Sequence, residues 1–477
     1  MPYDPTLLRV DDKVKSRDMR AYTEHMTKQQ RLVLWISILA SFVAFLDGSV
    51  INVALPAITA EFSSGLSVQQ WVVDAYLITL GSLILVAGSL SDLFGRKRIL
   101  ELGLIGFAIT SILCAVAPTS EFLIVSRGLQ GIAGALLVPS SLALIISTFK
   151  GQAQGKAIGS WTAWTGISFI IGPLVGGLLV DAGSWRLIFA INIIPILVTL
   201  WLMRKLEIPE KARSGTKLDV YGALLCAIGL GGTVYALIEQ PNYGWSSPLI
   251  FIPLIIGLLS LAVFFWHERR TRHPMLPLGL FSVRNFAIGN LATLAIYAGL
   301  SLGTFIIAIF VQQVGGYSAT EAGLALIPIT LIMFFLSSRF GALAGKYGPR
   351  LFMAVGPILG AIGFLAMLWV DSSVSYWALL PGIVIFGVGL SITVAPLTSA
   401  ILGAIDDAQA GIGSAINNAV ARIAGLLAIA AIGPIIGAQL DLDGFYRAVM
   451  VTAGLLLAGG IVSAIGIVNA QSTDATA

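Results

Sequence analysis

The feature that most constrains this chain is a series of fourteen apolar runs separated by short polar segments. A helix needs about 20 apolar residues to cross a bilayer, and each run meets that length. Lipid offers no hydrogen bonds to the backbone, so spanning segments must satisfy their own as helices do. We therefore predict an all-α polytopic membrane protein with spans near residues 32–57, 69–91, 98–117, 121–148, 156–181, 185–204, 219–238, 248–267, 285–313, 321–344, 350–370, 376–403, 409–438 and 443–468.

Composition agrees with a membrane location. Hydrophobic residues make up 57% of the chain and charged residues 11%, whereas soluble domains carry roughly 25% charged residues. The 52 glycines suit helices whose backbones approach closely in lipid. The first residues are polar and show no cleavable signal pattern.

No motif supports catalysis or a cofactor. Cys114 and Cys226 lie inside apolar runs, so we predict no disulfide framework. His25, His267 and His273 lack the spacing of metal ligands, and no Gly-x-x-x-x-Gly-Lys-Ser/Thr phosphate loop occurs. We expect no cofactor, no metal, no nucleic-acid partner and no direct use of ATP.

Lys and Arg residues alternate between loops in a way that predicts the orientation. Cytoplasmic loops of membrane proteins carry the excess of these residues. With the amino terminus inside, the outside loops contain almost none, Arg186 and Arg447 being the exceptions. Fourteen spans then place both termini in the cytoplasm. The inside set comprises Arg9, Lys13, Lys15, Arg17, Arg20, Lys28, Arg31, Arg96, Lys97, Arg98, Lys150, Lys156, Arg204, Lys205, Lys211, Arg213, Lys217, Arg269, Arg270, Arg272, Arg284, Lys346 and Arg350.

The chain also repeats itself. The segment GSLSDLFGRKRIL (88–100) is similar to GALAGKYGPRLFM (341–353), and the Gly-Pro pair at Gly172 recurs at Gly433. Duplicated halves are typical of secondary transporters, whose substrate site lies between the repeats near the midplane. Two runs have no counterpart and indicate an insertion. The expected units are a basic tail (1–31), a six-helix bundle (32–205), two inserted helices with their loops (206–284), a second six-helix bundle (285–470) and a tail (471–477).

Four motifs carry a resemblance to a known family. They are LDGSVINVALPAI (46–58), GSLSDLFGRKR (88–98), RGLQGIAGALLVPSS (127–141) and GISFIIGPLVGGLL (166–179). In this order and on these spans, they resemble the major facilitator superfamily, in particular its fourteen-helix branch of drug:proton antiporters. The resemblance covers residues 32 to 468 and implies two six-helix bundles plus two extra helices.

The resemblance implies roles for two of these motifs. The loop with Gly88, Asp92, Gly95, Arg96 and Lys97 latches the outward-open state in the family. The alternative is an ordinary basic cytoplasmic loop, and the second repeat has Gly345 where the first has its acid. The fifth span carries the family's exporter motif, for which generic packing of small residues is the alternative. Its residues are Gly166, Gly172, Pro173, Gly176 and Gly177.

Charged residues within spans are functional candidates because a charge in lipid is costly. Counting 1.5 Å per residue places Asp47, Asp74 and Arg127 at similar depths, so we expect them to share a cavity. We predict that Asp47 and Arg127 couple transport to protons, the alternative for Arg127 being a clamp on backbone carbonyls. Asp74 is a candidate acid for cationic substrates or, alternatively, a wet vestibule residue. For Arg422, helix–helix hydrogen bonding is the alternative to a functional role.

Further residues are predicted to line the substrate site. Glu239 lies at a helix end, where a solvated position is the simpler interpretation, and Trp161 can face either lipid or substrate. The substrate-binding candidates are Asp74, Asn52, Gln130, Trp161, Gln312 and Gln313.

We predict a proton-driven exporter of small apolar or cationic compounds that works by alternating access in the plasma membrane. Its partners would be small molecules, protons and membrane lipids, and it would function as a monomer. The alternatives are a dedicated exporter of one metabolite, siderophore, peptide or lipid, and, more remotely, a membrane enzyme.

The orientation can be tested with one cysteine. A Gly215→Cys variant should resist an impermeant thiol reagent added to intact cells and react after the cells are opened, because the basic loop around it is predicted to be cytoplasmic. Labelling from outside intact cells would contradict the orientation.

Overall fold

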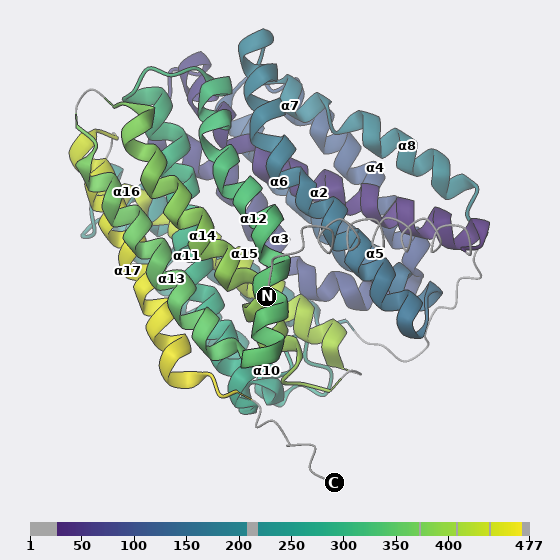
Figure 1. The fold of residues 1–477 in the computed structure, drawn as a ribbon. Coiled ribbons are helices and arrows are strands. Elements are labelled where there is room, and N and C mark those ends of the chain that lie inside the picture. Colours follow the sequence, from purple (N-terminus) through teal and green to yellow (C-terminus); the bar gives the residue numbers. More distant parts are fainter. Residues whose placement is uncertain (1–25, 208–217, 372–373, 407–408, 438–439, 470–477) are drawn as a thin grey trace, which may run out of the picture.

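The computed structural model describes residues 26–207, 218–371, 374–406, 409–437 and 440–469. The termini 1–25 and 470–477, and the loop that holds Gly215, lie outside the described residues. The described part is helical, without strands (Figure 1). Fourteen helices within it are long and apolar enough to cross a membrane, which confirms the predicted fold class. Thirteen of these spans contain one long helix each, and the span Leu187–Arg204 contains two short ones. The long helices are α2 (Lys28–Glu61), α3 (Leu66–Phe94), α4 (Arg96–Ala115), α5 (Ser120–Thr148), α6 (Gly151–Ala182), α9 (Val220–Tyr243), α10 (Pro248–Arg270), α11 (Arg284–Gln313), α12 (Ala319–Tyr347), α13 (Pro349–Ala366), α14 (Tyr376–Leu402), α15 (Ala410–Ala430) and α17 (Leu442–Gly466).

Two of the predicted runs are interrupted. The sixth consists of α7 (Leu187–Ala190) and α8 (Ile193–Arg204). The thirteenth ends with α15, and the short α16 (Ile432–Ile436) follows. The Gly-Pro pair at Gly433 thus lies in a short helix after a break, whereas α6 continues through its own pair at Gly172. The two Gly-Pro segments are therefore similar in sequence but differ in local structure. Two 3-10 turns, η1 (Leu278–Ser282) and η2 (Met367–Trp369), complete the elements.

The loop repeat corresponds to a repeated turn. Gly95 alone links α3 to α4, with φ 98°, and Gly348 alone links α12 to α13, with φ 86°. A residue with a Cβ rarely adopts such a backbone conformation. Glycine at these two positions therefore allows each helix to reverse direction within one residue.

The helices form two bundles and an inserted pair. Helices α2 to α8 pack together, as do α11 to α17. The inserted α9 and α10 pack against each other, and α9 also contacts α3, α15 and α16. The insertion therefore touches both bundles through one of its two helices.

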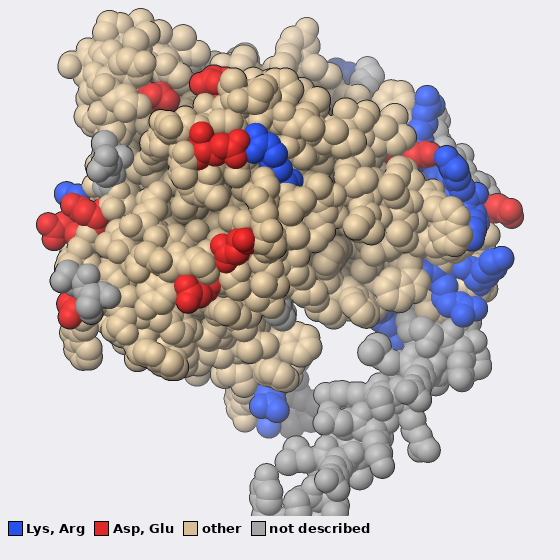
Figure 2. Space-filling model, turned by 90° about the horizontal axis from the view of Figure 1, so that it is seen from above, with Lys and Arg blue, Asp and Glu red and all other residues tan. Residues whose placement is uncertain are grey.

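The two ends of the molecule differ in charge. We call the end where α3 meets α4 the basic end, because the helix termini at Arg96, Arg204, Arg284 and Lys346 lie there. The opposite end, the far end, carries most of the acidic helix termini. Figure 2 shows most Lys and Arg side chains along the right edge of the molecule, and Asp and Glu over the left and centre. The two exceptional arginines at the far end are both held, Arg186 by Glu61 at 2.7 Å and Arg447 by the Ile436 carbonyl at 2.8 Å.

The two bundles pack tightly at the far end through α6 and α12. A Cβ on Gly177 would lie 2.6 Å from Cα of Thr320, and a Cβ on Gly323 would lie 2.8 Å from the Pro173 carbonyl carbon. Such approaches require glycine. Asp181 of α6 adds a polar contact, since it accepts hydrogen bonds from the backbone N–H of Thr320 at 2.8 Å and of Ala319 at 3.2 Å. These contacts form what we call the α6–α12 seam.

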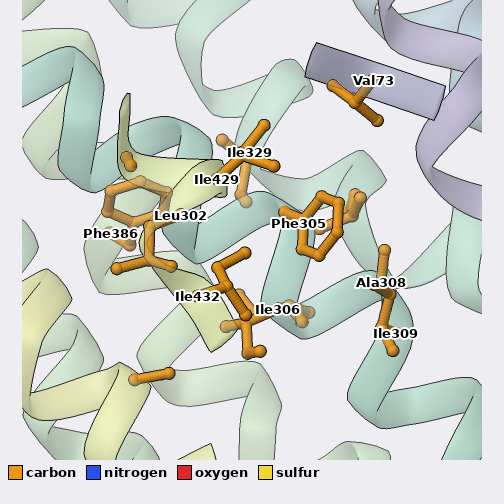
Figure 3. Close-up of a cluster of buried hydrophobic side chains, with 14 of the residues drawn as sticks. Val73, Leu302, Phe305, Ile306, Ala308, Ile309, Ile329, Phe386, Ile429 and Ile432 are labelled. Atoms are coloured by element: carbon orange, nitrogen blue, oxygen red, sulfur yellow. The ribbon is translucent and has the colours of Figure 1, made fainter. Parts of the chain in front are cut away.

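A second contact between the bundles joins α3 to α15. The Gln70 amide donates to the Ile429 carbonyl at 2.6 Å and to the Ala430 carbonyl at 3.0 Å. Apolar side chains continue the contact, since Val73 of α3 belongs to the same buried cluster as Phe305 of α11 and Ile429 of α15, all labelled in Figure 3. The hydrogen bonds of these two contacts therefore lie toward the far end.

The bundles separate toward the basic end. One large apolar cluster joins the far-end part of α2, from Val50 to Ile58, to the second bundle. The basic-end part of α2, from Val33 to Ala44, belongs to a different cluster whose buried members all come from the first bundle. The ribbons diverge accordingly in Figure 1. The conformation is closed at the far end and parted at the basic end.

The α6–α12 seam can be tested by substitution. Gly177→Val should hold the far end apart, because overpacking costs about 1–3 kcal/mol, which corresponds to ~5- to 150-fold in a conformational equilibrium. Spin labels on cysteines that replace the exposed Glu121 and Asp443 allow the far-end distance to be measured by double electron–electron resonance. The distance between the labels should be longer in Gly177→Val than in the unsubstituted protein. Gly166→Val is the matched control, since its Cβ would meet nothing within 4 Å. Equal distance distributions in both variants would contradict the role of the seam.

Candidate functional site

A buried ion pair lies inside the first bundle. Nη1 of Arg127 (α5) donates to Oδ2 of Asp47 (α2) at 2.6 Å, and both side chains are at most 1% exposed. Nε of Arg127 donates to the Val72 carbonyl at 3.0 Å. The structure thus brings together the two residues that we predicted for proton coupling. It also contains the backbone clamp that we considered as the alternative for Arg127.

Neutral polar side chains complete the pair. The other oxygen of Asp47 accepts from Nδ2 of Asn192 at 2.9 Å and from Nε2 of Gln130 at 3.1 Å. Gln130 also accepts from Arg127 at 2.6 Å and donates to Ser111 at 3.0 Å. Asp47 therefore accepts three hydrogen bonds, the arrangement that an ionised carboxylate requires when it is buried. We call these five side chains the Asp47 network.

Close helix packing makes this network possible. A Cβ on Gly131 would lie 3.0 Å from the backbone carbonyl carbon of Tyr76, so α5 lies directly against α3. This approach lets Arg127 reach the α3 backbone. The rings of Tyr76 and Phe189 cover the guanidinium at 4.5 and 5.6 Å, and such cation–π contacts gain strength when they are desolvated. The glycines of RGLQGIAG thus position the charge.

The arrangement can act as a protonation switch. Adding a proton to Asp47 would remove the charge that holds Arg127 and would replace an acceptor with a donor facing Gln130 or Asn192. A buried arginine that loses its counter-ion is costly, so the surrounding helices would have to rearrange. The chemistry of the site would thus allow protonation of Asp47 to change how these helices pack.

Asp74 does not join the network. It is 0% exposed, and neither of its oxygens has a hydrogen-bond partner. On the same face of α3, Gln70 bonds to α15, and a Cβ on Gly81 would lie 3.6 Å from Ile423 of α15. Helical spacing therefore directs Asp74 toward α15. In this conformation Asp74 is fully buried and shares no hydrogen bond with the Asp47 network. Its role toward cationic substrates stays a prediction.

The other predicted substrate residues are scattered. Gln130 is fully buried in the Asp47 network, and Trp161 is partly buried with its indole N–H donating to Ser41 at 3.0 Å. Gln312 donates to the Ala308 carbonyl one turn earlier at 2.9 Å. Gln313 instead lines a far-end pocket of about 490 Å³ between the bundles. In this conformation these residues do not line one common pocket, and their contact with substrate stays a prediction.

The loop motif forms a local ion pair at the basic end. Asp92 and Arg96 meet at 2.9 Å, with side-chain exposures of 34% and 26%. Lys97 donates to the Leu206 carbonyl at 2.8 Å and ties the loop to the end of α8. Gly88 makes no close approach to another element. In this conformation the motif contacts its own bundle.

The glycines of the exporter motif have different neighbours. A Cβ on Gly172 would lie 2.9 Å from Cβ of Ser49, and one on Gly176 would lie 3.0 Å from Val53, both on α2. Gly177 faces α12 across the bundles, and Gly166 approaches nothing. Pro173 and Gly177 of the motif therefore belong to the α6–α12 seam, whereas Gly172 and Gly176 pack within the first bundle.

The two remaining charges also differ in surroundings. Glu239 accepts from the indole N–H of Trp71 at 2.8 Å and from Asn242 at 2.8 Å, so it links α9 to α3. Arg422 of α15 lies across the bundle interface, with its guanidinium 5.4 Å from the ring of Phe45 on α2. Arg422 thus faces the opposite bundle.

Sequence reasoning missed Asn192 and Ser111. Asn192 is a single amide in an otherwise apolar run and falls where α7 ends. An amide within a span is itself a signal, because lipid cannot satisfy it. Among the described residues, no group of three or more His, Cys, Asp or Glu could hold a metal ion.

A helical protein of fourteen spans, with two bundles that meet at one end and a hydrogen-bonded ion pair within one of them, has the architecture of a membrane transporter. The chain belongs to the Major Facilitator Superfamily, whose family model matches residues 37–429.

Curated relatives carry transport and resistance names. Multidrug resistance protein Stp of Mycobacterium tuberculosis is 33% identical over 425 residues, which cover 87% of this chain and 78% of that protein. The methylenomycin A resistance protein of Bacillus subtilis is 32% identical over 410 residues, covering 85% and 87% of the two chains. A probable actinorhodin transporter of Streptomyces coelicolor is 33% identical over 407 residues, with 83% and 70% covered.

Solved structures agree on the fold. A D-xylose-proton symporter superposes with TM-score 0.66 at 16% identity and covers 93% of this chain and 99% of its own. A peptide transporter in complex with sulfate gives TM-score 0.68 at 16% identity, with 92% and 94% covered.

Proposed function

We propose that this protein exports small drug-like molecules from the cell by alternating access and that protons moving inward drive the export. The observation that carries the proposal is the Asp47 network, in which one buried carboxyl group on α2 accepts hydrogen bonds from Arg127 and Gln130 of α5, and Gln130 in turn donates to Ser111 of α4. The names of the relatives, multidrug resistance and antibiotic transport, support the choice of cargo.

The basic end is proposed to face the cytoplasm of a plasma-membrane protein, following the rule for Lys and Arg. The conformation is then inward-facing. Asp47 in its ionised, paired form is the state expected after proton release to the cytoplasm. We propose the bundle boundaries 32–205 and 285–470 with the insertion 206–284 between them, and a monomer surrounded by lipid as the functional unit.

The loop motif is proposed as a latch of the opposite, outward-facing state. Here Asp92 pairs with Arg96, four residues away, and such an exposed local pair contributes little stability. Asp92 is therefore available to a partner on the second bundle when the basic end closes.

Asp47→Asn tests the coupling. Uphill export should collapse while downhill exchange of the same substrate persists, because a gradient can act only through a group that titrates differently in the two states. The measurement is substrate-induced pH change and counterflow of methylenomycin A, the antibiotic in the name of one relative, in proteoliposomes. Protein abundance and melting temperature must be followed, since a lone buried Arg127 costs about 3–5 kcal/mol. A companion variant with Asp47→Asn and Arg127→Leu removes both charges and separates stability from coupling.

Asp74→Asn is the matched carboxylate control. We expect proton-coupled export to persist in this variant, because Asp74 lies outside the Asp47 network. If Asp47→Asn keeps full coupling and Asp74→Asn abolishes it, the coupling role belongs to Asp74.

Asp92→Asn tests the latch. Transport should slow several-fold at unchanged protein abundance, because a charge-assisted contact present in only one state is lost. The distance between spin labels at positions 121 and 443 should shift toward the shorter value of the closed far end. A normal rate together with an unchanged distance distribution would count against the latch.

A further inference from the structure

Arg422 occupies an unusual position for a charge in a membrane protein. It lies in the middle of α15 and is partly buried, and α15 packs against α11 and α3. Within the described part of the chain, the four ion pairs do not include Arg422. A cation inside a span normally has a partner or marks a pathway.

The guanidinium points to the opposite bundle. It lies 5.4 Å from the ring of Phe45, and its Nη1 would be 4.0 Å from a Cβ on Gly48, both on α2. Asn52 lies on the same face of α2, seven residues from Phe45. All three α2 residues are partly exposed, unlike their buried neighbours Leu46 and Val50. The charge therefore faces a partly open stripe of α2 between the bundles.

The nearby acids are not available to Arg422. Asp47 is one residue from Gly48, yet its carboxylate turns into the first bundle and is held by Arg127, Gln130 and Asn192. Asp74 is fully buried and has no hydrogen-bond partner, so it does not pair with Arg422. The Asp47–Arg127 pair has no net charge.

Along α15, Arg422 lies between the far end, where the bundles are in contact, and the basic end, where they separate. On its far-end side, Ile429 and Ala430 of the same helix contact Gln70. On its basic-end side, Asn417 bonds within the second bundle, to Thr293 at 2.9 Å. A substrate that enters from the basic end and reaches the closed contact would meet this guanidinium.

We infer that Arg422 is a specificity-determining residue that selects substrates with a carboxylate or another anionic oxygen group, with the ring of Phe45 and the amide of Asn52 opposite. The inference deepens the proposed function and rests on it for the direction of transport. A planar guanidinium binds carboxylates through two parallel hydrogen bonds. Without a protein acid beside it, the same charge disfavours organic cations. Asp74, the candidate acid for cationic substrates, is fully buried in this conformation.

Binding to the purified full chain tests the inference without transport. The probes are 2-naphthoate, 2-naphthamide and 2-naphthamidinium, which share one ring system and differ in charge. The naphthoate should bind about tenfold or more tightly than the amide, as a hydrogen bond to a charged group allows, and the amidinium should bind most weakly. Equal affinity for all three, or tightest binding of the amidinium, would overturn the inference.

Variants at the same position separate specificity from a structural role. Arg422→Gln should reduce naphthoate affinity about tenfold or more while leaving the amide within about twofold, and Arg422→Lys should restore part of the loss. Arg422→Glu should reverse the order and favour the amidinium. A parallel loss of affinity for all three probes in Arg422→Gln would indicate a structural residue and would overturn the inference.

A matched control and a transport arm complete the experiment. Asn417→Leu alters a polar residue on the same helix that bonds within its own bundle, and it should keep the naphthoate preference. If it removes the preference as Arg422→Gln does, the inference fails. Naphthoate selectivity without uphill export in proteoliposomes would refute the proposed function and leave the assignment of Arg422 intact. Uphill export without charge selectivity would support the proposed function and refute the assignment of Arg422.

Discussion

A charge within the bilayer must find its partner inside the protein, because lipid supplies none. The pairing of Asp47 with Arg127 satisfies this constraint, and much of the first bundle is arranged around it. Glycines bring α5 against α3 so that Arg127 reaches the α3 backbone, and the break between α7 and α8 brings the Asn192 amide to the carboxylate. Aromatic rings close the remaining sides of the guanidinium. The polar centre and the helix packing therefore depend on each other.

The inserted helices have a definite place in this arrangement. Helix α9 contacts α3 of the first bundle and α15 and α16 of the second, and Glu239 binds Trp71 at the far end. Helix α10 is mostly exposed along its apolar length, with 17% of its most hydrophobic window buried. The insertion therefore presents one helix to lipid and uses the other to bridge the outer parts of both bundles.

Sequence alone was sufficient for the spans and for the meeting of Asp47 with Arg127, because hydropathy and the rise per residue determine length and depth. It was insufficient for Asp74. Depth counting gives no face, and the face that Asp74 presents depends on how α3 packs against α15, a contact between residues 359 positions apart. Asn192 escaped notice for a related reason, since its reach to Asp47 depends on a helix break that hydropathy does not reveal. Glycine motifs indicated close packing without naming the partner, which for Gly177 proved to be the start of α12 in the other bundle.

The α6–α12 seam has a mechanical consequence. Helix α12 begins at Ala319, within the seam, and continues for 29 residues to Tyr347 at the basic end, a length of about 43 Å at 1.5 Å per residue. Turning such a rod by about 10° around its held end moves the free end by ~7 Å. In such a rotation the seam would be the fulcrum and the helix the lever arm. A displacement of a few tenths of an ångström beside the fulcrum, too small to disturb packing there, would become a movement at the basic end wide enough to admit or exclude a small molecule.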